Sequence, residues 1–542
     1  MLSAAPSAEI EIPTTDIPSF FFQSVRRHAA FTDADNPRPL LIDGTEGISA
    51  SLTIDSLEQL CQQLASGLYH EMGVRRGDVV AIAMPSSIHY PAVALAALMV
   101  GAKCTLANPA YTARELRHQL EDSGAAHVIT TSAQCPTVCE AVASGSGPVR
   151  KLLVVDEDAP SCSLPTRTLH SILGSREFPR ARIDNDKDMC GTVAFIPYSS
   201  GTTGPPKGVM LSHRNIVACV LQSATLTAPQ SFPSTNIGVL PMFHVFGLLY
   251  LCFLMPYNGT TTVVMPQFSM PRFLKLVADY RATETMLVPP IINGLVKMPS
   301  FEHDLSSLRR IVVGAAALSA ETIVALERRL PGLCITQGYG MTEASPTITL
   351  NPPGMRNATS VGTLAPGIQA KVVDTESGQP LAPGETGELC FRGPNIMMGY
   401  LNNAAATRDI IDADGFLHTG DIGRIDEHNY VILTDRKKEL IKFNGFQVAP
   451  AELEGLLMQH PQVTDCAVAG IYCDERQTEV PKAYLVLSAD VPAAEHARVG
   501  KEIVGWLNKQ VAYFKQLRGG FAILDRIPKN ASGKILRRLL RK

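Results

Sequence analysis

The sequence predicts an α/β protein: a large N-terminal domain of parallel or mixed sheets flanked by helices, followed by a small, mobile α+β C-terminal domain. Two observations lead to this fold class. Short runs rich in β-branched residues alternate with stretches of helical apolar spacing, as buried parallel sheets covered by helices require. The chain also has 542 residues, which is enough for two or more hydrophobic cores.

Individual elements follow from local patterns. Residues 55–71 and 112–122 have helical apolar spacing, and Thr112 with Glu115 matches a capping box at the start of the second stretch. Strands are expected at residues 79–84, 127–131, 152–155, 261–265 and 311–313.

The domain boundary is expected near Asp435, where the charged run DRKKE interrupts the strand-like run YVILT. Beyond it, an early proline and three leucines predict a helix over residues 450–460. We therefore predict a large domain over residues 1–434 and a small one over residues 435–542.

Composition excludes several classes of protein. A hydrophobic content of 45% and a charged content of 18% are those of an ordinary globular protein. The net charge of −3 gives no general attraction for nucleic acid or anionic membrane. The N-terminus carries acids where a secretion signal needs bases, and the C-terminus does not match Ser-Lys-Leu. We therefore expect a cytoplasmic location.

One apolar stretch, residues 239–257 (VLPMFHVFGLLYLCFLMPY), is long enough to raise the question of a membrane span. It carries no acid, lysine or arginine, but it contains two prolines, a glycine and a histidine. Because these residues break or burden a spanning helix, a buried segment of a globular domain is predicted instead.

The stretch YSSGTTGPPKGVML, residues 198–211, has the composition of a loop that binds phosphate. It departs from the common phosphate-loop pattern, which has glycine before the lysine and serine or threonine after it, because Lys207 lies between Pro206 and Gly208. Glycines let backbone N–H groups converge on an oxyanion, hydroxyls add donors, and the lysine adds charge. A flexible surface turn is the alternative.

Three further motifs favour a nucleotide. GYGMTE has the composition of a turn that ends in Thr342 and Glu343, a hydroxyl and a carboxylate suited to phosphate and Mg²⁺. HTGD places Asp421 after an expected tight turn, suited to ribose hydroxyls, and Arg436 follows at the proposed boundary. PKNASGK places Lys534 on a glycine loop.

Together these motifs resemble the adenylate-forming acyl-CoA synthetases, the AMP-binding enzymes, and most closely the branch of 4-coumarate–CoA ligase and firefly luciferase. The resemblance covers nearly the whole chain. It rests on SSGTTGPPKGVMLSHRN, PMFHVFG, QGYGMTEASP, GELCFRGPNIMMGY, DGFLHTGDIG, DRKKELIKFNGFQVAPAELE and PKNASGKILRR. It implies an AMP-binding domain with an acyl pocket, a C-terminal lid domain, and use of ATP, Mg²⁺ and coenzyme A.

The resemblance also implies roles for individual residues. The loop closes on the ATP phosphates and is expected to be mobile, since pyrophosphate must leave. Glu343 is the metal ligand, and His244 lies between the acyl pocket and the phosphates. The matching nucleotide contacts are Ser199, Ser200, Gly201, Thr202, Thr203, Lys207, Gln337, Gly338, Tyr339, Thr342, Asp421, Arg436 and Lys438.

Two lysines match different half-reactions: Lys534 the adenylation step and Lys442 the thioester step. The second-step face also includes Gly445, Phe446 and Gln447, while Asn444 stands where the family often has lysine. The basic tail beyond Asp525 is expected to be a solvated face beside the coenzyme A channel and not a nucleic-acid site. The matching acyl-pocket positions are His244, Phe246, Tyr250, Gly314, Ala315, Ala316, Ala317, Ser345, Pro346 and Thr347.

The implied chemistry needs no protein nucleophile, because the substrate carboxylate attacks the α-phosphorus of ATP itself. The protein must neutralise charge and align the attack. A thiol then displaces AMP, and the small domain is expected to rotate about Asp435 between the two steps. The expected acid is an aryl acid, cinnamate- or 4-coumarate-like, or a medium-chain fatty acid. Because Phe246 stands where plant 4-coumarate ligases commonly have tyrosine, the less polar acid is favoured.

Three alternatives stay open from the sequence. The first is a stand-alone adenylation enzyme that loads a carrier protein in place of coenzyme A. The second is a non-catalytic nucleotide-binding protein, which the complete set of charged motif residues argues against. The third is luciferase-like oxygenation, which no motif demands.

Overall fold

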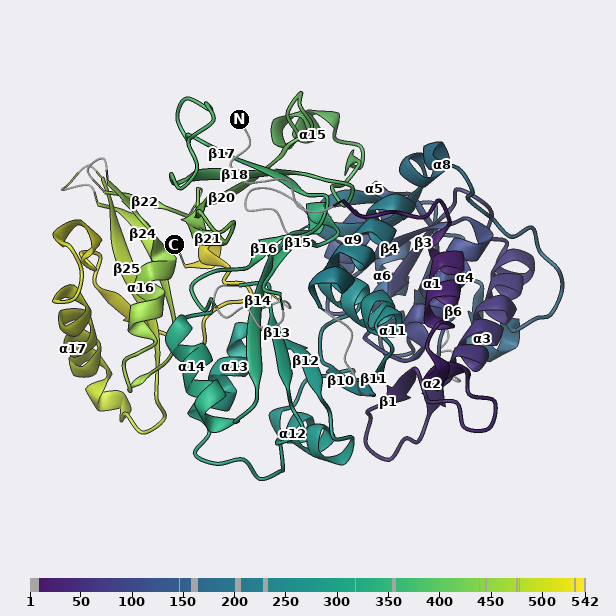
Figure 1. Cartoon of the computed structure of the whole chain (residues 1–542), viewed down its shortest axis with the longest axis horizontal. Helices are drawn as coiled ribbons and strands as arrows, with labels where there is room; N and C mark the ends of the chain where they lie inside the picture. Colours follow the sequence, from purple (N-terminus) through teal and green to yellow (C-terminus); the bar gives the residue numbers. More distant parts are fainter. Residues whose placement is uncertain are drawn as a thin grey trace.

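The computed structural model describes residues 9–145, 147–156, 164–199, 206–227, 233–316, 318–352, 357–437, 439–443, 446–473, 476, 478–530 and 533–540. Two large sheets form most of the molecule, with helices packed around them, and the C-terminal elements lie to one side (Figure 1).

The first large sheet is parallel across most of its width. It runs in the order β19-β9-β8-β4-β3-β5-β6-β7, and only the β8–β9 and β9–β19 pairs at one end are antiparallel. The runs expected to be buried strands at 79–84, 127–131 and 152–155 form neighbouring strands in it. Its strands are β3 (Val79–Ala83), β4 (Lys103–Leu106), β5 (Ala125–Thr130), β6 (Lys151–Val154), β7 (Thr166–Thr168), β8 (Val193–Ser199), β9 (Lys207–Ser212) and β19 (Gly399–Tyr400).

The second large sheet has a parallel centre, β14-β13-β12-β10-β11-β1, and antiparallel strands at both ends. Parallel strands have their carboxyl ends at the same edge, where ligands of α/β proteins commonly bind. Its strands are β1 (Leu41–Asp43), β2 (Ser51–Leu52), β10 (Ser234–Gly238), β11 (Thr260–Val264), β12 (Glu284–Leu287), β13 (Arg310–Val313), β14 (Cys334–Gly340), β15 (Thr347–Leu350) and β16 (Thr363–Leu364).

Helices connect and cover these strands. The predicted capping box is present, because Thr112 Oγ1 accepts from the backbone N–H of Glu115, and the Glu115 carboxylate accepts from that of Thr112. The helices up to residue 410 are α1 (Ile17–Val25), α2 (Ala29–Thr32), α3 (Ile54–Gly67), α4 (His89–Val100), α5 (Ala113–Ser123), α6 (Cys135–Ala143), α7 (Leu169–Ile172), α8 (Asp186–Gly191), α9 (His213–Leu226), α10 (Val245–Gly247), α11 (Met255–Tyr257), α12 (Met270–Asp279), α13 (Pro289–Lys297), α14 (Ala320–Arg329) and α15 (Ala404–Ile410).

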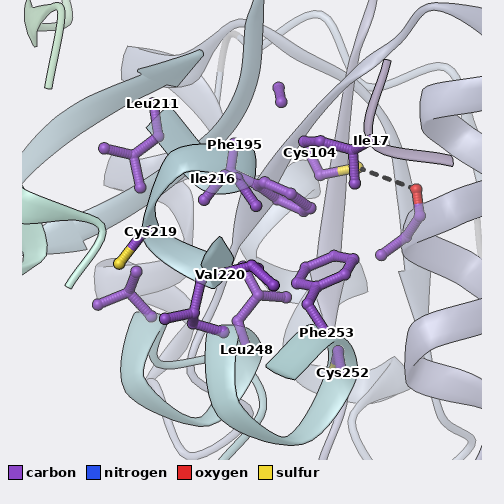
Figure 2. Packing of buried hydrophobic residues seen from close by; sticks show 14 of the residues in the cluster. Ile17, Cys104, Phe195, Leu211, Ile216, Cys219, Val220, Leu248, Cys252 and Phe253 are labelled. Atoms are coloured by element: carbon purple, nitrogen blue, oxygen red, sulfur yellow. Dashed lines mark hydrogen bonds between the residues drawn. The ribbon is translucent and has the colours of Figure 1, made fainter. Parts of the chain in front are cut away.

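The apolar stretch 239–257 is buried, as predicted. It forms α10, a π-helix η2 (Leu248–Leu254) and α11, whose side chains lie in the core. Figure 2 shows Leu248 and Phe253 packed beside Phe195 of β8 and Val220 of α9. Within the described ranges, no helix is long and apolar enough to cross a membrane.

The chain after residue 365 builds smaller sheets. An antiparallel sheet joins β17 (Gln369–Val373), β18 (Gly387–Arg392), β20 (Leu417–Ile425) and β21 (Val431–Arg436). The C-terminal part has its own hydrophobic core around α16 and α17. Leu453, Val468 and Ile503 are buried in this core. Its elements are β22 (Ile441–Phe443), β23 (Phe446–Val448), α16 (Pro450–Leu457), β24 (Val463–Cys473), β25 (Thr478–Leu487), α17 (His496–Asn508) and β26 (Phe521–Ile523).

Three local expectations are corrected. The stretch Gly338–Gly340 is the end of strand β14 and not a turn, and a Cβ on Gly340 would lie 2.0 Å from the carbonyl oxygen of Pro346. Glycine is therefore used there for close strand approach. HTGD lies inside β20, where Gly420 has a φ of +70°. The strand β21 continues through Asp435, whose half-buried carboxylate accepts a hydrogen bond from the backbone N–H of Ala451.

Candidate active site

A cavity lies at the carboxyl edge of β13 and β14 and holds about 460 Å³ of empty space, including the part open to solvent. Predicted acyl-pocket and nucleotide positions meet in it, although they are far apart in the sequence. Those lining it are His244, Phe246, Tyr250, Gly314, Ala315, Gly338, Tyr339, Thr342, Pro346 and Thr347.

Two aromatic rings form the apolar end of the cavity. The centroids of Phe246 and Tyr250 lie 4.9 Å apart in an edge-to-face arrangement. Phe246 packs over Gly314, where an added Cβ would lie 3.1 Å from its Cζ. The hydroxyl of Tyr250 lies 3.3 Å from Oγ1 of Thr347, and burial raises the pKa of Tyr250 to about 12. This hydroxyl therefore stays protonated and already has a partner.

His244 lies at the start of α10, facing the same cavity. Its Nδ1 accepts a 3.2 Å hydrogen bond from the backbone N–H of Phe246, and burial lowers the pKa of His244 to about 4. A neutral ring whose Nδ1 accepts carries its proton on Nε2. His244 is therefore a neutral hydrogen-bond donor through Nε2.

The pKa of His244 gives a prediction about acid stability. Between the ordinary pKa of 6.5 and about 4, the unfolded chain binds a proton that the folded chain does not. Stability is thus intact above pH 6.5 and falls as the pH drops towards 4, by about 3 kcal/mol in total. The variant His244→Asn keeps a side chain that can accept the capping hydrogen bond. Its melting temperature should fall less than that of the wild type between about pH 7 and pH 5. Equal losses would contradict the assignment.

A second polar contact, between Tyr339 and Asp421, lies beside the cavity. The hydroxyl of Tyr339 donates a 2.6 Å hydrogen bond to Oδ2 of Asp421, a buried residue of β20. Asp421 is opposite Arg436 in the register of β20 and β21, so two predicted ribose-contacting positions are neighbours in space. Gln337, another matched nucleotide position, is buried next to Gly338 at the end of β14. Its amide ties the backbone of Leu318 to that of Ala358, at 3.1 and 3.0 Å.

Two residues of the predicted phosphate loop, Ser199 and Lys207, are the last residue of β8 and the first residue of β9 in the structure. They are opposite each other in the β8–β9 register. Nζ of Lys207 lies 4.8 Å from the ring centroid of Tyr400, and the hydroxyl of Tyr400 donates a 2.8 Å hydrogen bond to Oε1 of Glu343, which is buried. Tyr400 received no role from the sequence, although it ends the motif GELCFRGPNIMMGY.

The two C-terminal lysines lie in different settings. The loop of Lys534 reaches the main body, because Gly533 adjoins Pro290 and Val288, which follow β12. The side chain of Asn530 accepts from the backbone N–H of Lys534 at 2.8 Å and shapes this loop. Lys442 is exposed on β22, and its backbone N–H donates to Oε2 of Glu479 at 2.8 Å.

Several predicted positions either do not line the cavity or fall outside the residues that the structure describes. Ala316 is described but is exposed and does not line the cavity. The backbones of Phe446 and Gln447 belong to β23 and that of Arg436 to β21, but their side chains are not described. The positions that fall outside the described residues are Ser200, Gly201, Thr202, Thr203, Ala317, Lys438 and Gly445.

Two family models match the chain. Residues 28–401 match the AMP-binding enzyme model, and residues 452–534 match the AMP-binding enzyme C-terminal domain. The chain belongs to the AMP-binding enzyme family. It is 36% identical over 549 residues to the probable 4-coumarate–CoA ligase 1 of Dictyostelium discoideum, an alignment that covers 98% of this chain and 96% of the relative. It is 38% identical over 536 residues to 4-coumarate-CoA ligase 1 of Narcissus pseudonarcissus, with 96% and 92% covered.

A solved structure of similar fold contains the expected ligands. O-succinylbenzoate coenzyme A synthetase from Bacillus subtilis, in complex with ATP and magnesium ion, aligns with a TM-score of 0.77 and 27% identity, over 96% of this chain and 99% of that chain. With the relatives above, it places this AMP-binding enzyme among the ATP-dependent CoA ligases. The chain is therefore an acid–thiol ligase. The identity of the acid has to be inferred from the geometry of the cavity.

A Mg²⁺ site in this AMP-binding enzyme needs only one protein carboxylate. Among the residues that the structure describes, no cluster of three or more His, Cys, Asp or Glu side chains could hold a metal by itself. Mg²⁺ in nucleotide enzymes is usually held by one or two carboxylates together with substrate phosphates. Glu343 is buried beside the cavity-lining Thr342, so its carboxylate fits that requirement.

Proposed function

We propose that this ligase converts a carboxylic acid and coenzyme A into an acyl-CoA thioester through an acyl-AMP intermediate, releasing AMP and pyrophosphate. The observation that carries the proposal is the single cavity in which an apolar aromatic end meets the residues matched to nucleotide binding. The loop of Lys534 lies at the end of the neighbouring strand β12. An acid and ATP bound side by side at this edge would have their reacting groups adjacent.

In the first step, a carboxylate oxygen of the acid forms a bond to the α-phosphorus of ATP, and the bond to pyrophosphate breaks. No protein atom becomes covalently attached. Bound Mg²⁺ would neutralise phosphate charge, and Glu343 is the residue that would hold it. Lys207 and Lys534 add positive charge, and Nε2–H of His244 can donate to an oxygen of the bound carboxylate.

In the second step, the sulfur of coenzyme A attacks the acyl carbonyl carbon, and AMP leaves with the oxygen that bridged carbon and phosphorus. Lys442, Gly445, Phe446 and Gln447 would form the face used here. This needs the part beyond Asp435 to rotate. In this structure Oδ2 of Asp435 accepts a 3.2 Å hydrogen bond from the backbone N–H of Ala451, in the first turn of α16. Asp435 thus connects β21 to the C-terminal helix at the proposed hinge.

The acid should be one of low polarity at its far end. Phe246 offers no hydrogen bond, and the hydroxyl of Tyr250 already bonds to Thr347. Burying a ring hydroxyl without a partner costs roughly 1–3 kcal/mol. We therefore propose an unsubstituted aryl or medium-chain fatty acid as the preferred substrate, in contrast to the acid in the names of the 4-coumarate–CoA ligase relatives.

This preference predicts the order of kcat/KM among three acids. Cinnamate or hexanoate should exceed 4-coumarate by about tenfold, which corresponds to about 1.4 kcal/mol. Phe246→Tyr should reduce or reverse this difference in kcat/KM, because the new tyrosine adds a hydrogen-bond partner for the ring hydroxyl of 4-coumarate. Tyr250→Phe is the matched variant, and it should leave the order of the acids unchanged. A tenfold preference of the wild type for 4-coumarate would refute the substrate proposal without affecting the reaction type.

The reaction type is tested by screening carboxylic acids for AMP release with and without coenzyme A. The proposal predicts acid-dependent AMP and an acyl-CoA product when free coenzyme A is present. AMP formation with no thioester on free coenzyme A would favour the carrier-protein alternative. Absence of AMP with every acid would favour a non-catalytic nucleotide-binding protein.

A further inference from the structure

Tyr400 lies between two groups that the proposed function uses. Its side chain is buried, and the hydroxyl donates a 2.8 Å hydrogen bond to Oε1 of Glu343. Its ring centroid lies 4.8 Å from Nζ of Lys207, within the range of a cation–π contact. A single side chain thus contacts both the proposed metal-binding carboxylate and the proposed phosphate-binding lysine.

The motif that carries Tyr400 is fixed to the turn of Glu343. The side-chain amide of Asn395 donates to the carbonyl oxygens of Ala344 and Thr347, each at 2.8 Å. The backbone N–H of Met397 donates to the carbonyl oxygen of Glu343 at 2.9 Å. These bonds hold the backbone at Glu343 and just after it, so Tyr400 meets the Glu343 carboxylate from a constrained direction.

The same motif is fixed to the hairpin of Lys207. Strand β19 pairs with β9, with Tyr400 opposite Val209, and the backbone N–H of Leu401 donates to the carbonyl oxygen of Gly208 at 2.8 Å. The motif therefore joins the hairpin that ends at Lys207 to the turn that carries Glu343. Tyr400 is the residue through which this connection contacts both functional side chains.

We propose that Tyr400 is a positioning residue that orients the Glu343 carboxylate towards Mg²⁺ and holds Lys207 beside it for binding of MgATP. The inference rests on the proposed function. Oε1 of Glu343 is occupied by the Tyr400 hydroxyl, and the carboxylate has no other hydrogen-bond partner within the described part of the chain. Fixing one oxygen in this way determines where the other can meet a cation. Hydrogen bonds to a metal ligand commonly change metal affinity by about 10- to 100-fold.

The test is equilibrium binding of ATP across a Mg²⁺ series, measured as thermal stabilisation without any acid or coenzyme A. Tyr400→Phe keeps the ring and removes only the hydroxyl, so the Mg²⁺ concentration for half-maximal stabilisation should rise about tenfold. Tyr400→Leu also removes the ring under Lys207, so it should weaken ATP binding further, even at saturating Mg²⁺.

A matched control is Tyr484→Phe, which removes the hydroxyl of another buried tyrosine, the one that donates to the backbone carbonyl oxygen of Leu540 in the C-terminal part. It should lower thermal stability but leave the Mg²⁺ dependence unchanged. In a double-mutant cycle, the effect of Tyr400→Phe on the Mg²⁺ requirement should disappear in the Glu343→Gln background. An unchanged Mg²⁺ requirement in Tyr400→Phe, or additive effects in the cycle, would overturn the inference. A wild type that binds no MgATP would instead overturn the proposed function.

Discussion

Replacing Lys534 with alanine should slow acyl-AMP formation by about 10²- to 10³-fold, which is the usual loss when one group that stabilises developing charge is removed. Its loop lies against Val288 and Pro290, at the end of β12, so the structure presents the lysine at the edge where the acid and ATP would react. The same variant should convert supplied acyl-AMP and coenzyme A to thioester at nearly the wild-type rate. Acid-dependent pyrophosphate exchange measures the first step, and thioester formation from synthetic acyl-AMP measures the second.

The complementary variant is Lys442→Ala, which should show the opposite bias. The side chain of Lys442 is exposed on β22, between two buried residues, so its removal should spare the fold. Lys534→Arg, which keeps the positive charge, should recover part of the adenylation rate. If Lys534→Ala and Lys442→Ala each slowed both half-reactions to the same degree, domain alternation about Asp435 would be wrong.

Glu343→Gln should depress adenylation by roughly 10²-fold and raise the Mg²⁺ concentration needed for half-maximal rate. An amide oxygen is a weaker ligand for a hard cation than a carboxylate. Glutamine keeps the shape of the buried Glu343 side chain while removing its charge. The rate of acid-dependent pyrophosphate exchange, measured across a Mg²⁺ series, checks the prediction.

The control for this change is another buried acid. Glu284 accepts hydrogen bonds from Ser234 and Thr260 at 2.7 and 2.9 Å and does not line the cavity. Glu284→Gln should lower stability while leaving the Mg²⁺ requirement unchanged. A Glu343→Gln variant with wild-type Mg²⁺ dependence would remove Glu343 from the proposed metal site.

Local sequence signals predicted most of the fold, because the interactions that form these elements are short in range. The capping box of Thr112 and Glu115 places the start of α5, and runs rich in β-branched residues locate the strands β3, β5 and β6. The errors occurred where distant segments decide the local conformation. Gly340 is in a strand because it pairs with Thr347 of β15, and this pairing has no local signature.

For the candidate site, as for the fold, residues within a single motif could be predicted and contacts between motifs could not. The resemblance supplied residue types for both ends of the cavity, and in the structure Phe246, Gly314 and Gly338 line the same cavity. The resemblance did not supply Tyr400, whose partners lie in two other motifs. Its contacts with Lys207 and Glu343 depend on how three segments pack. A pattern within one segment therefore gave no indication of them.

The acyl-AMP intermediate is the central claim, and transfer of an oxygen isotope tests it most directly. The acid is labelled with ¹⁸O in its carboxyl group and turned over with ATP and coenzyme A. If the carboxylate attacks the α-phosphorus and the thiol later attacks the carbonyl carbon, one labelled oxygen remains on AMP at each turnover and the other on the thioester. Label in inorganic phosphate together with formation of ADP, or AMP that carries no label, would contradict the account.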